Sequence, residues 1–447
     1  STGAGWLIIR KSQPDRGTGV GDHRPLFKVT QEQLDALLKR HEMFRNARMG
    51  GARAVLTNYD LTGLNLAGRD LAHADLTGCI LRRANLAGAT LDCCTLFAAD
   101  LREANLAGAS MVKVDLRGAS LRGADLTGAN LVSADLRDGS LAERAADGSL
   151  KIVVVESDAS PADMQGAKLA NANLSQAKLS GAIAQHTDFT DAVMRGTKLV
   201  RANLRNATLD GAILEGADMS GADVRGASLK GAVLTGAVLM LTEMAGADMA
   251  GALTDKPAGK PASALPRPLE QMLKLHAEWV GTAGQGGLAL DLTGYDLRHE
   301  SCLSHACLTR LHAPGVILYG VDLSAAQIQV GNLKGADLRG ANLSRCDLRG
   351  INLAEAQLGN ANLSEANLGY LKIDANRFVV SDLSGAKLRY ANLSGARLVK
   401  ADFRGADLSF ANLLLADLKE TDLTGTRLSG TRVKREQLAE VVGFKIP

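Results

Sequence analysis

The chain is poor in the residues that build large cores and disulfide frameworks. Aromatic residues make up 3% of its 447 positions. Six cysteines are present, without the spacing of a disulfide framework, so we expect reduced thiols and a reducing compartment. No apolar run approaches the roughly 18 residues of a membrane span, and the start of the sequence lacks the basic and apolar regions of a secretory signal. We therefore expect a cytoplasmic protein. The cysteines are Cys79, Cys93, Cys94, Cys302, Cys307 and Cys346.

Strong net charge and catalytic motifs are absent as well. The formal net charge is +3, from 51 basic and 48 acidic residues, so bulk charge gives no case for nucleic-acid binding. No phosphate loop, dinucleotide fingerprint, nucleophile elbow or HExxH motif occurs. We predict a non-enzymatic protein without a cofactor.

What the chain has in abundance is a repeat of five residues. A large apolar residue, usually Leu, recurs at every fifth position in three arrays, 56–141, 164–249 and 318–433. We call this the anchor position. Ala is common two residues before it, at what we call the small position, Asp or Asn stands directly before it, and Gly often follows two residues after it. The stretch 336–340, Ala-Asp-Leu-Arg-Gly, shows all four features.

A period of five fits neither an α-helix nor a simple strand. It fits a coil with four short sides, in which the anchor and small positions point inward and the other three residues point outward. Such coils of 20 residues would stack at about 4.8 Å, with backbone hydrogen bonds along the axis. Cys79, Cys94 and Cys346 occupy small positions, which favours packed thiols. The pattern predicts an all-β solenoid.

The Ala-Asp/Asn-Leu-x-x motif closely resembles that of the pentapeptide-repeat proteins, over about two thirds of the chain. This resemblance implies a right-handed quadrilateral β-helix. We expect this chain to form two of them, each preceded by a short α-helical cap, because a predicted helix precedes each part of the array.

The larger organisation is a duplicated module. We expect an N-terminal extension at 1–29, with a β-prone segment at Trp6–Ile9, and a helix plus first array at 30–253. A Pro-rich linker at 254–268 leads to a second helix and array at 269–447. Residues 142–163 interrupt the first array, and Asp147-Gly148 followed by an apolar run predicts a projecting β-hairpin or looped strand.

The two predicted helices match at a constant offset of 235 residues. Their apolar faces carry a histidine each, His41 and His276, which suggests either a paired ligand site or packed side chains bonded to nearby backbone; the second is favoured. Each helix is predicted to cap the first coil of its array. The face residues are Leu34, Leu38, His41 and Phe44, matched by Leu269, Leu273, His276 and Trp279.

The second array begins irregularly. Its register slips between Leu297 and Leu303, and Pro314-Gly315 distorts one repeat; from Leu318 to Val433 the spacing predicts continuous coils, followed by a short capping helix within 434–442. Cysteines and histidines gather in the irregular part, where zinc binding is one interpretation and an irregular first coil the favoured one. They are His299, Cys302, His305, Cys307 and His312.

An exposed apolar stripe is the main candidate for a partner surface. Tyr370, Tyr390 and Phe410 stand 20 residues apart at one outward position, which predicts an aromatic ladder. The ladder either binds a partner or only stiffens the coils by self-stacking. Leu414, Leu415, Val379, Val380 and Val399 extend this candidate, and Val238, Met240 and Leu241 form a second one.

These features favour an interaction scaffold or assembly protein that binds protein partners, or further copies of itself, through flat faces and the apolar stripe. The family resemblance implies an alternative, a DNA-mimicking protein that binds topoisomerases. Such mimicry needs a strongly negative rod, whereas the arrays here are close to neutral. A secreted bacterial effector is a further alternative.

Overall fold

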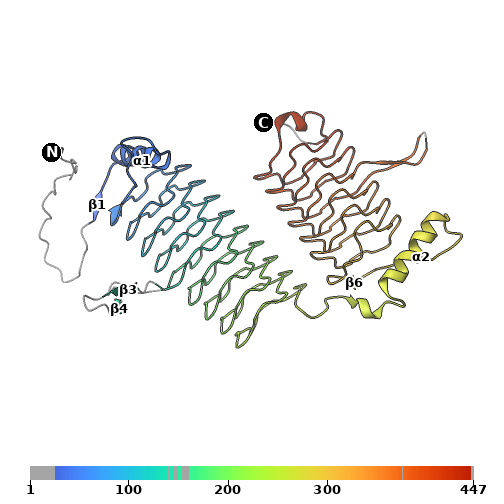
Figure 1. Ribbon diagram of the computed structural model, residues 1–447, viewed down its shortest axis with the longest axis horizontal. Helices are drawn as coiled ribbons and strands as arrows, with labels where there is room; N and C mark the ends of the chain where they lie inside the picture. The colour runs from blue at the N-terminus through green and yellow to red at the C-terminus, as the bar shows by residue number, and fades with distance from the viewer. Residues whose placement is uncertain (1–25, 139–140, 145–149, 154–160, 375, 444–447) are drawn as a thin grey trace, which may run out of the picture. The chain divides into compact units, whose positions relative to one another are not determined.

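The computed structural model describes residues 26–138, 141–144, 150–153, 161–374 and 376–443 (Figure 1). The chain divides into two compact units, unit 1 ending at Lys256 and unit 2 beginning at Pro257. The β-prone segment expected at Trp6–Ile9 and the turn expected at Asp147-Gly148 lie outside the described residues.

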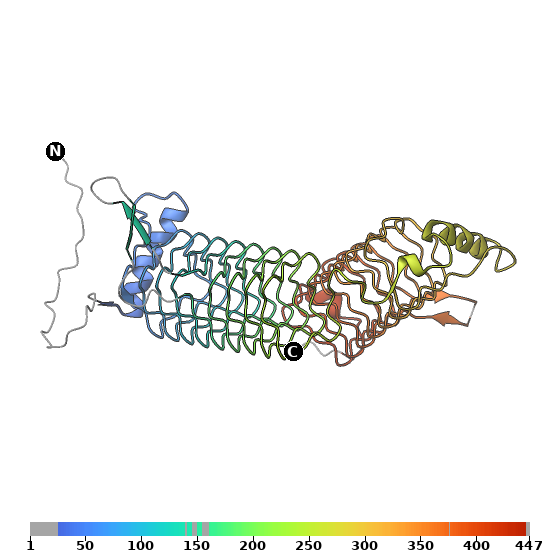
Figure 2. The same cartoon turned by 90° about the horizontal axis from the view of Figure 1, so that it is seen from below.

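Both units consist of stacked four-sided coils, as Figures 1 and 2 show. Parallel bridges join residues 20 positions apart, for example Val55 with Asp75 and Asp75 with Thr95. The Leu56 N–H donates to the Asp75 carbonyl (2.7 Å), and the Asp75 N–H donates to the Ala54 carbonyl (3.0 Å). Hydrogen bonds therefore run along the axis, and the predicted β-helical solenoid is confirmed.

The turn at each corner of a coil accounts for two preferences of the repeat, Gly two residues after the anchor and Asp or Asn directly before it. The Ala74 N–H donates to the Leu71 carbonyl (2.9 Å), closing a turn whose third residue, His73, is left-handed with φ 64°. Glycine is common at this third position because a side chain there costs roughly 1–2 kcal/mol. The Asp or Asn before the anchor caps the same turn: Asp60 Oδ1 accepts the Thr62 N–H (3.1 Å).

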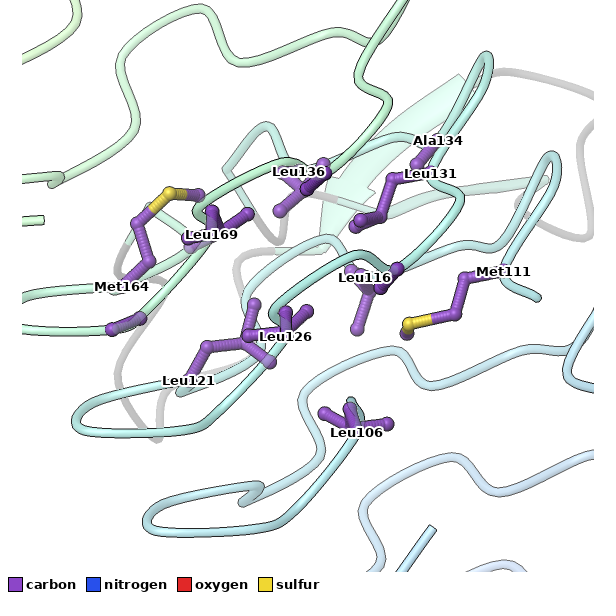
Figure 3. Close-up of a cluster of buried hydrophobic side chains, with 14 of the residues drawn as sticks. Leu106, Met111, Leu116, Leu121, Leu126, Leu131, Ala134, Leu136, Met164 and Leu169 are labelled. Atoms are coloured by element: carbon purple, nitrogen blue, oxygen red, sulfur yellow. The ribbon is translucent and has the colours of Figure 1, made fainter. Parts of the chain in front are cut away.

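The core is a column of anchor and small residues, and Figure 3 shows part of it in unit 1. Some polar residues at small positions are also fully buried, and several of them donate to the anchor carbonyl of the preceding coil. Thr187 Oγ1 donates to the Met164 carbonyl, and Cys79 Sγ to the Leu56 carbonyl, both at 2.8 Å. Burial raises the pKa of the Cys79 and Cys346 thiols to about 12, so both cysteines are protonated packing groups.

Unit 1 begins with a short strand and a helix. Strand β1 (Phe27–Lys28) pairs in parallel with β2 (Tyr59–Asp60), and α1 (Gln31–Arg45) follows, with Thr30 and Gln33 forming a capping box. Leu34 and Leu38 are buried in the same cluster as the first anchors. Phe44 differs from the prediction, because its side chain is 44% exposed and stacks on His41 instead of facing the core.

Unit 2 begins in the same way. Strand β5 (Lys260–Pro261) pairs in parallel with β6 (Tyr295–Asp296), and η1 (Ala262–Ala264) and α2 (Leu269–Gly281) follow β5. The segment expected to be only a linker thus contributes β5 and η1 to unit 2. On α2, Leu269 and His276 are buried, whereas Leu273 and Trp279 are half-buried.

A hairpin interrupts the array of unit 1, where the sequence predicts one. Strand β3 (Leu141–Arg144) pairs antiparallel with β4 (Leu150–Val153). The predicted boundary is wrong by one repeat: Ser120 bridges to Asp163, so Met164 and not Leu141 occupies the anchor position after Leu136. Figure 3 shows Met164 in the cluster with Leu136.

Unit 2 contains a second hairpin that the sequence analysis did not predict. Strands β7 (Leu371–Lys372) and β8 (Phe378–Val379) pair antiparallel and appear as the orange pair of arrows in Figure 2. Asn352 bridges to Asp382, 30 positions on, so a coil contains ten additional residues. The expectation of continuous coils from Leu318 to Val433 is therefore wrong. Ile373 and Phe378 stand at five-residue spacing but are 52% and 53% exposed.

The far ends of the units differ. In the last coil of unit 1 the inward-facing residues Leu239, Met244 and Met249 are only half-buried. In unit 2 the short helix expected within 434–442 is the 3₁₀ helix η2 (Arg435–Leu438), and Gln437 Nε2 donates to the carbonyls of Leu413 (2.8 Å) and Ala416 (2.7 Å).

Candidate interaction surfaces

The β7–β8 hairpin separates two of the three aromatic residues expected to form one ladder. The Gly350 N–H donates to the Gly369 carbonyl, and the Tyr370 ring lies under Lys400, 30 positions on. Tyr390 instead follows the column of Asn360, whose N–H donates to the Arg389 carbonyl. The hairpin adds ten residues, which equal two sides of a coil, so Tyr370 and Tyr390 lie at different corners. The prediction of a ladder of three aromatic rings is therefore wrong.

Tyr370 takes part in a cluster at the base of the hairpin. Its ring meets the Phe378 ring edge-on, with centroids 5.7 Å apart. Lys400 Nζ lies 5.5 Å from the Tyr370 centroid and 5.3 Å from the Phe378 centroid, within cation–π range, and 3.3 Å from Glu420 Oε2. The hairpin is therefore anchored to the next coil through a cation held between two rings.

The hairpin packs closely on the preceding coil at Gly350 and is joined to it by hydrogen bonds of Ser381. A Cβ on Gly350 would lie 3.1 Å from Val379 Cγ1, so a side chain there would press against the hairpin. Ser381 follows the hairpin at a small position and is fully buried. Its hydroxyl lies 3.1 Å from the Leu348 carbonyl and 3.2 Å from the Gly369 carbonyl, and it accepts the Gly350 N–H at 3.0 Å.

Tyr390 and Phe410 do stack, with centroids 5.0 Å apart and rings 7° from parallel. The Phe410 ring covers Gly430, where a Cβ would lie 2.6 Å from it. Both rings are half-buried, which fits the self-stacking interpretation of this pair. The remaining residues of the predicted stripe divide by exposure: Leu415 is 76% exposed, and Leu414, Val379, Val380 and Val399 are half-buried.

The second predicted surface lies on the last coil of unit 1. Val238, Met240 and Leu241 are exposed there, Leu241 to 83%. The hydrogen bonds of Val238 run to the preceding coil, where its carbonyl accepts the Met219 N–H (2.8 Å). The three residues thus mark the end of a stack.

The described histidines and cysteines do not gather into a metal site. Within the part of the chain that the structure describes, no three His, Cys, Asp or Glu side chains are placed to hold a metal ion, the segment 299–312 included. His41 Nδ1 accepts the Ala54 N–H (3.0 Å), and His276 Nδ1 accepts the Leu290 N–H (3.0 Å). Burial lowers the pKa of both imidazoles, so they are neutral groups that bind backbone.

One surface feature was missed by the sequence analysis. A depression of about 310 Å³ lies on the first coils of unit 1. The signal available in the sequence was the placement of Arg82, Arg102 and Arg122 at 20-residue spacing. The depression is lined by Thr62, Arg82, Arg83, Arg102 and Glu103.

No helix among the described residues combines the length and the apolar character that a bilayer span requires.

Comparisons with solved structures find further repeat proteins. HetL, involved in heterocyst differentiation regulation in the cyanobacterium Nostoc sp. strain PCC 7120, is 24% identical over 77% of this chain and 86% of its own, with a TM-score of 0.22. QnrB1, a plasmid-mediated fluoroquinolone resistance protein, is 19% identical over 46% of this chain and 92% of its own, with a TM-score of 0.27. Rfr23, from the cyanobacterium Cyanothece 51142, is 29% identical over 30% of this chain and 91% of its own, with a TM-score of 0.21. A comparison with curated proteins finds no match.

The family model for pentapeptide repeats matches eight copies that together cover more than half of the chain. The matches leave out the hairpins β3–β4 and β7–β8 and include the coils on both sides of each. They span residues 60–96, 99–138, 161–196, 187–226, 217–253, 332–369, 381–413 and 401–435. The chain belongs to the pentapeptide-repeat family.

Proposed function

We propose that the protein is a non-enzymatic interaction scaffold that binds a protein partner through the β7–β8 hairpin of unit 2. The observation that carries this proposal is the exposure of large apolar side chains on a hairpin that the array does not need. Ile373 and Phe378 are 52% and 53% exposed, and Tyr370 is 38% exposed. We call these three residues, with Val379 and Lys400, the hairpin surface.

The hairpin has no evident part in building the coils. Without residues 371–380, Tyr370 would lead directly into Ser381-Asp382-Leu383, and the five-residue spacing would be kept. Exposure of large apolar side chains to water is unfavourable, and a partner that covers them would remove this cost. Aromatic residues are favoured at the centres of protein interfaces. The contacts of Lys400 and Ser381 fix the hairpin and so limit the entropy lost on binding.

The proposal includes the arrangement of the whole chain. We infer two modules of one design, in which a strand and a helix cover the first coil of each β-helix. Supporting observations are the parallel pairs β1–β2 and β5–β6, and the equivalent hydrogen bonds of His41 and His276 to the start of each array. Two capped rods would offer flat faces as well as the hairpin surface.

Ion pairing within repeats counts against the DNA-mimicking alternative. Arg102 binds the carboxylate of Asp100 through Nε and Nη2, and Arg225 binds Asp223 in the same way. The carboxylates of such repeats are neutralised locally, whereas a mimic of DNA would keep them free.

The test is affinity capture with the full chain and two matched deletions. Removing residues 371–380 deletes the hairpin surface, and removing residues 139–161 deletes the β3–β4 insertion while joining Asp138 to Ala162 in the same repeat spacing. Proteins retained from a lysate of the source cell are quantified by mass spectrometry. A partner should be retained by the wild type and by the 139–161 deletion, and lost by the 371–380 deletion and by Ile373→Ser/Phe378→Ser.

Thermal melting serves as the folding control, because both deletions should keep the cooperative transition of the arrays. Identical retained proteins for all four chains, or none for the wild type, would show that the hairpin surface binds no protein.

A further inference from the structure

We propose that the depression on unit 1 binds a multivalent oxyanion, such as the diphosphate group of a small molecule. Three guanidinium groups and one carboxylate line it, together with Thr62. Guanidinium groups match phosphate and carboxylate oxygens through pairs of N–H donors. This binding site is independent of the hairpin surface, which lies on the other unit.

The guanidinium groups are held in place by carboxylates of neighbouring residues. Arg82 Nε lies 2.5 Å from Asp100 Oδ2, and Arg83 Nε lies 2.7 Å from Glu103 Oε2. Arg102 binds Asp100 with Nε (2.8 Å) and Nη2 (2.7 Å). Side chains that are already fixed lose less rotamer entropy when a ligand arrives.

The way in which these pairs form leaves donors for a ligand. Within the described residues, the ion pairs of Arg82 and Arg83 use Nε alone, so the terminal nitrogens of both side chains remain for an anion. Arg82 and Arg102 share the carboxylate of Asp100, and Arg82 is also attracted by the carboxylate of Asp60, so the remaining N–H donors and not an excess of positive charge would hold a ligand. A ligand with several oxygens and more than one negative charge uses these donors best.

Space for the ligand comes from the first coil. Gly63 stands at the corner position that Arg83 and Glu103 occupy in the next two coils, and a Cβ on Gly63 would have no neighbour within 4 Å. The opening of about 310 Å³ is therefore bounded by one coil with a glycine and two with long side chains.

Unit 1 also contains a matched control site. Arg205 and Arg225 share the carboxylate of Asp223, at 2.8 and 2.7 Å, as Arg82 and Arg102 share Asp100. The residue after Arg205 is Asn206, so a third guanidinium at the place of Arg83 is absent from this repeat. Loss of Arg205 reports the effect of lowering net charge without touching the depression.

The experiment is isothermal titration calorimetry of the full chain with pyrophosphate, at constant ionic strength set by sodium chloride. We expect one binding site on the wild type that Arg82→Gln and Arg83→Gln each weaken about fivefold, the effect of roughly 1 kcal/mol for an exposed charge pair. Arg205→Gln should bind like the wild type. Gly63→Asp, which adds a carboxylate at the opening and keeps a residue type that tolerates positive φ, should abolish binding.

Circular dichroism checks that each variant is folded. The proposal is overturned if pyrophosphate does not bind the wild type, or if Arg83→Gln and Arg205→Gln change the affinity equally. Citrate titrated in the same way separates phosphate from carboxylate ligands: tighter binding of pyrophosphate supports the diphosphate assignment, and tighter binding of citrate overturns it.

Discussion

The two hairpins interrupt the same kind of array, yet only one of them is visible in the sequence. The β3–β4 insertion joins Ser120 to Asp163, 43 positions on, and the β7–β8 insertion joins Asn352 to Asp382, 30 positions on. A complete coil spans 20 positions, so the first insertion adds 23 residues and the second adds ten. Ten is a multiple of five, and the second hairpin therefore keeps the anchor spacing while it rotates every later repeat by half a coil.

This difference shows that a five-residue period identifies the repeats that form the sides of a coil. It does not identify which repeats of neighbouring coils stack on one another. Tyr370, Tyr390 and Phe410 keep a spacing of 20 in the sequence, but only the second and third stack. Coil register has to come from hydrogen bonds between neighbouring coils, such as that from the Asn392 side chain to Asn362 Oδ1 (3.2 Å).

The largest expected effect separates true anchors from hairpin residues. Leu393 and Phe378 both fit the five-residue spacing, but Leu393 is fully buried and Phe378 is 53% exposed. Leu393→Ala should lower the free energy of unfolding by about 3 kcal/mol because it leaves a cavity in the core, and Phe378→Ala by less than about 1 kcal/mol. Urea denaturation of both variants measures the difference. Equal losses would mean that Phe378 faces the core after all.

A smaller effect is expected where the hairpin rejoins the coil. Ser381→Ala removes a buried hydroxyl and leaves the Gly350 N–H and the Leu348 carbonyl without this partner. Both groups keep a second hydrogen bond, to the Gly369 carbonyl and from the Ile351 N–H. Because each of the two hydrogen bonds that are lost contributes about 1 kcal/mol, the free energy of unfolding should fall by about 2 kcal/mol. Chemical denaturation measures it. In the protein lacking residues 371–380 the same substitution should cost less, and an unchanged cost would separate Ser381 from the hairpin.

Two glycines test whether the hairpin rests on the coil. Gly350 and Gly335 have similar left-handed backbones, with φ of 69° and 65°, but only at Gly350 would a Cβ meet the hairpin. Gly335→Ala should cost about 1 kcal/mol from backbone strain alone, and Gly350→Ala should cost more because Val379 must move. Thermal melts compare the two variants. Equal shifts would place the hairpin away from Gly350.

The smallest effect concerns the buried histidine of each unit. Burial lowers the pKa of His41 and His276 in the folded protein, so below pH 6.5 the unfolded chain binds more protons than the folded one. Stability from these groups is complete above about pH 6.5 and falls as the pH drops below it. Melting temperatures between pH 7.5 and 5.5 measure the slope, which His41→Gln/His276→Gln should reduce. A slope of the opposite sign would contradict the neutral assignment.

Much of the fold can be predicted from the sequence, because the residues of each repeat determine both its core packing and its turn. The anchor fills the core, and Asp60 or its equivalents cap the corner, so the solenoid was predictable from local chemistry alone. The β7–β8 hairpin was not predictable from spacing, because its ten residues keep the five-residue spacing of the anchor positions. The available signal was composition: Leu371 and Asn376 replace the small residue, and Lys372 and Arg377 replace Asp or Asn, in two successive repeats. The arginine depression was missed because it depends on the side-chain geometry of three coils.

Disulfide trapping tests the central claim, the half-coil rotation by the hairpin, most directly. Asn362 and Asn392 are bridged neighbours in adjacent coils, whereas Asn362 and Asp382 would be neighbours only if the array were continuous. Adjacent coils bring Cα atoms to roughly 4.8 Å, within disulfide range. Under mild oxidation, with linked peptides identified by mass spectrometry, Asn362→Cys/Asn392→Cys should form a bond and Asn362→Cys/Asp382→Cys should not. A bond in the second pair and none in the first would contradict the account.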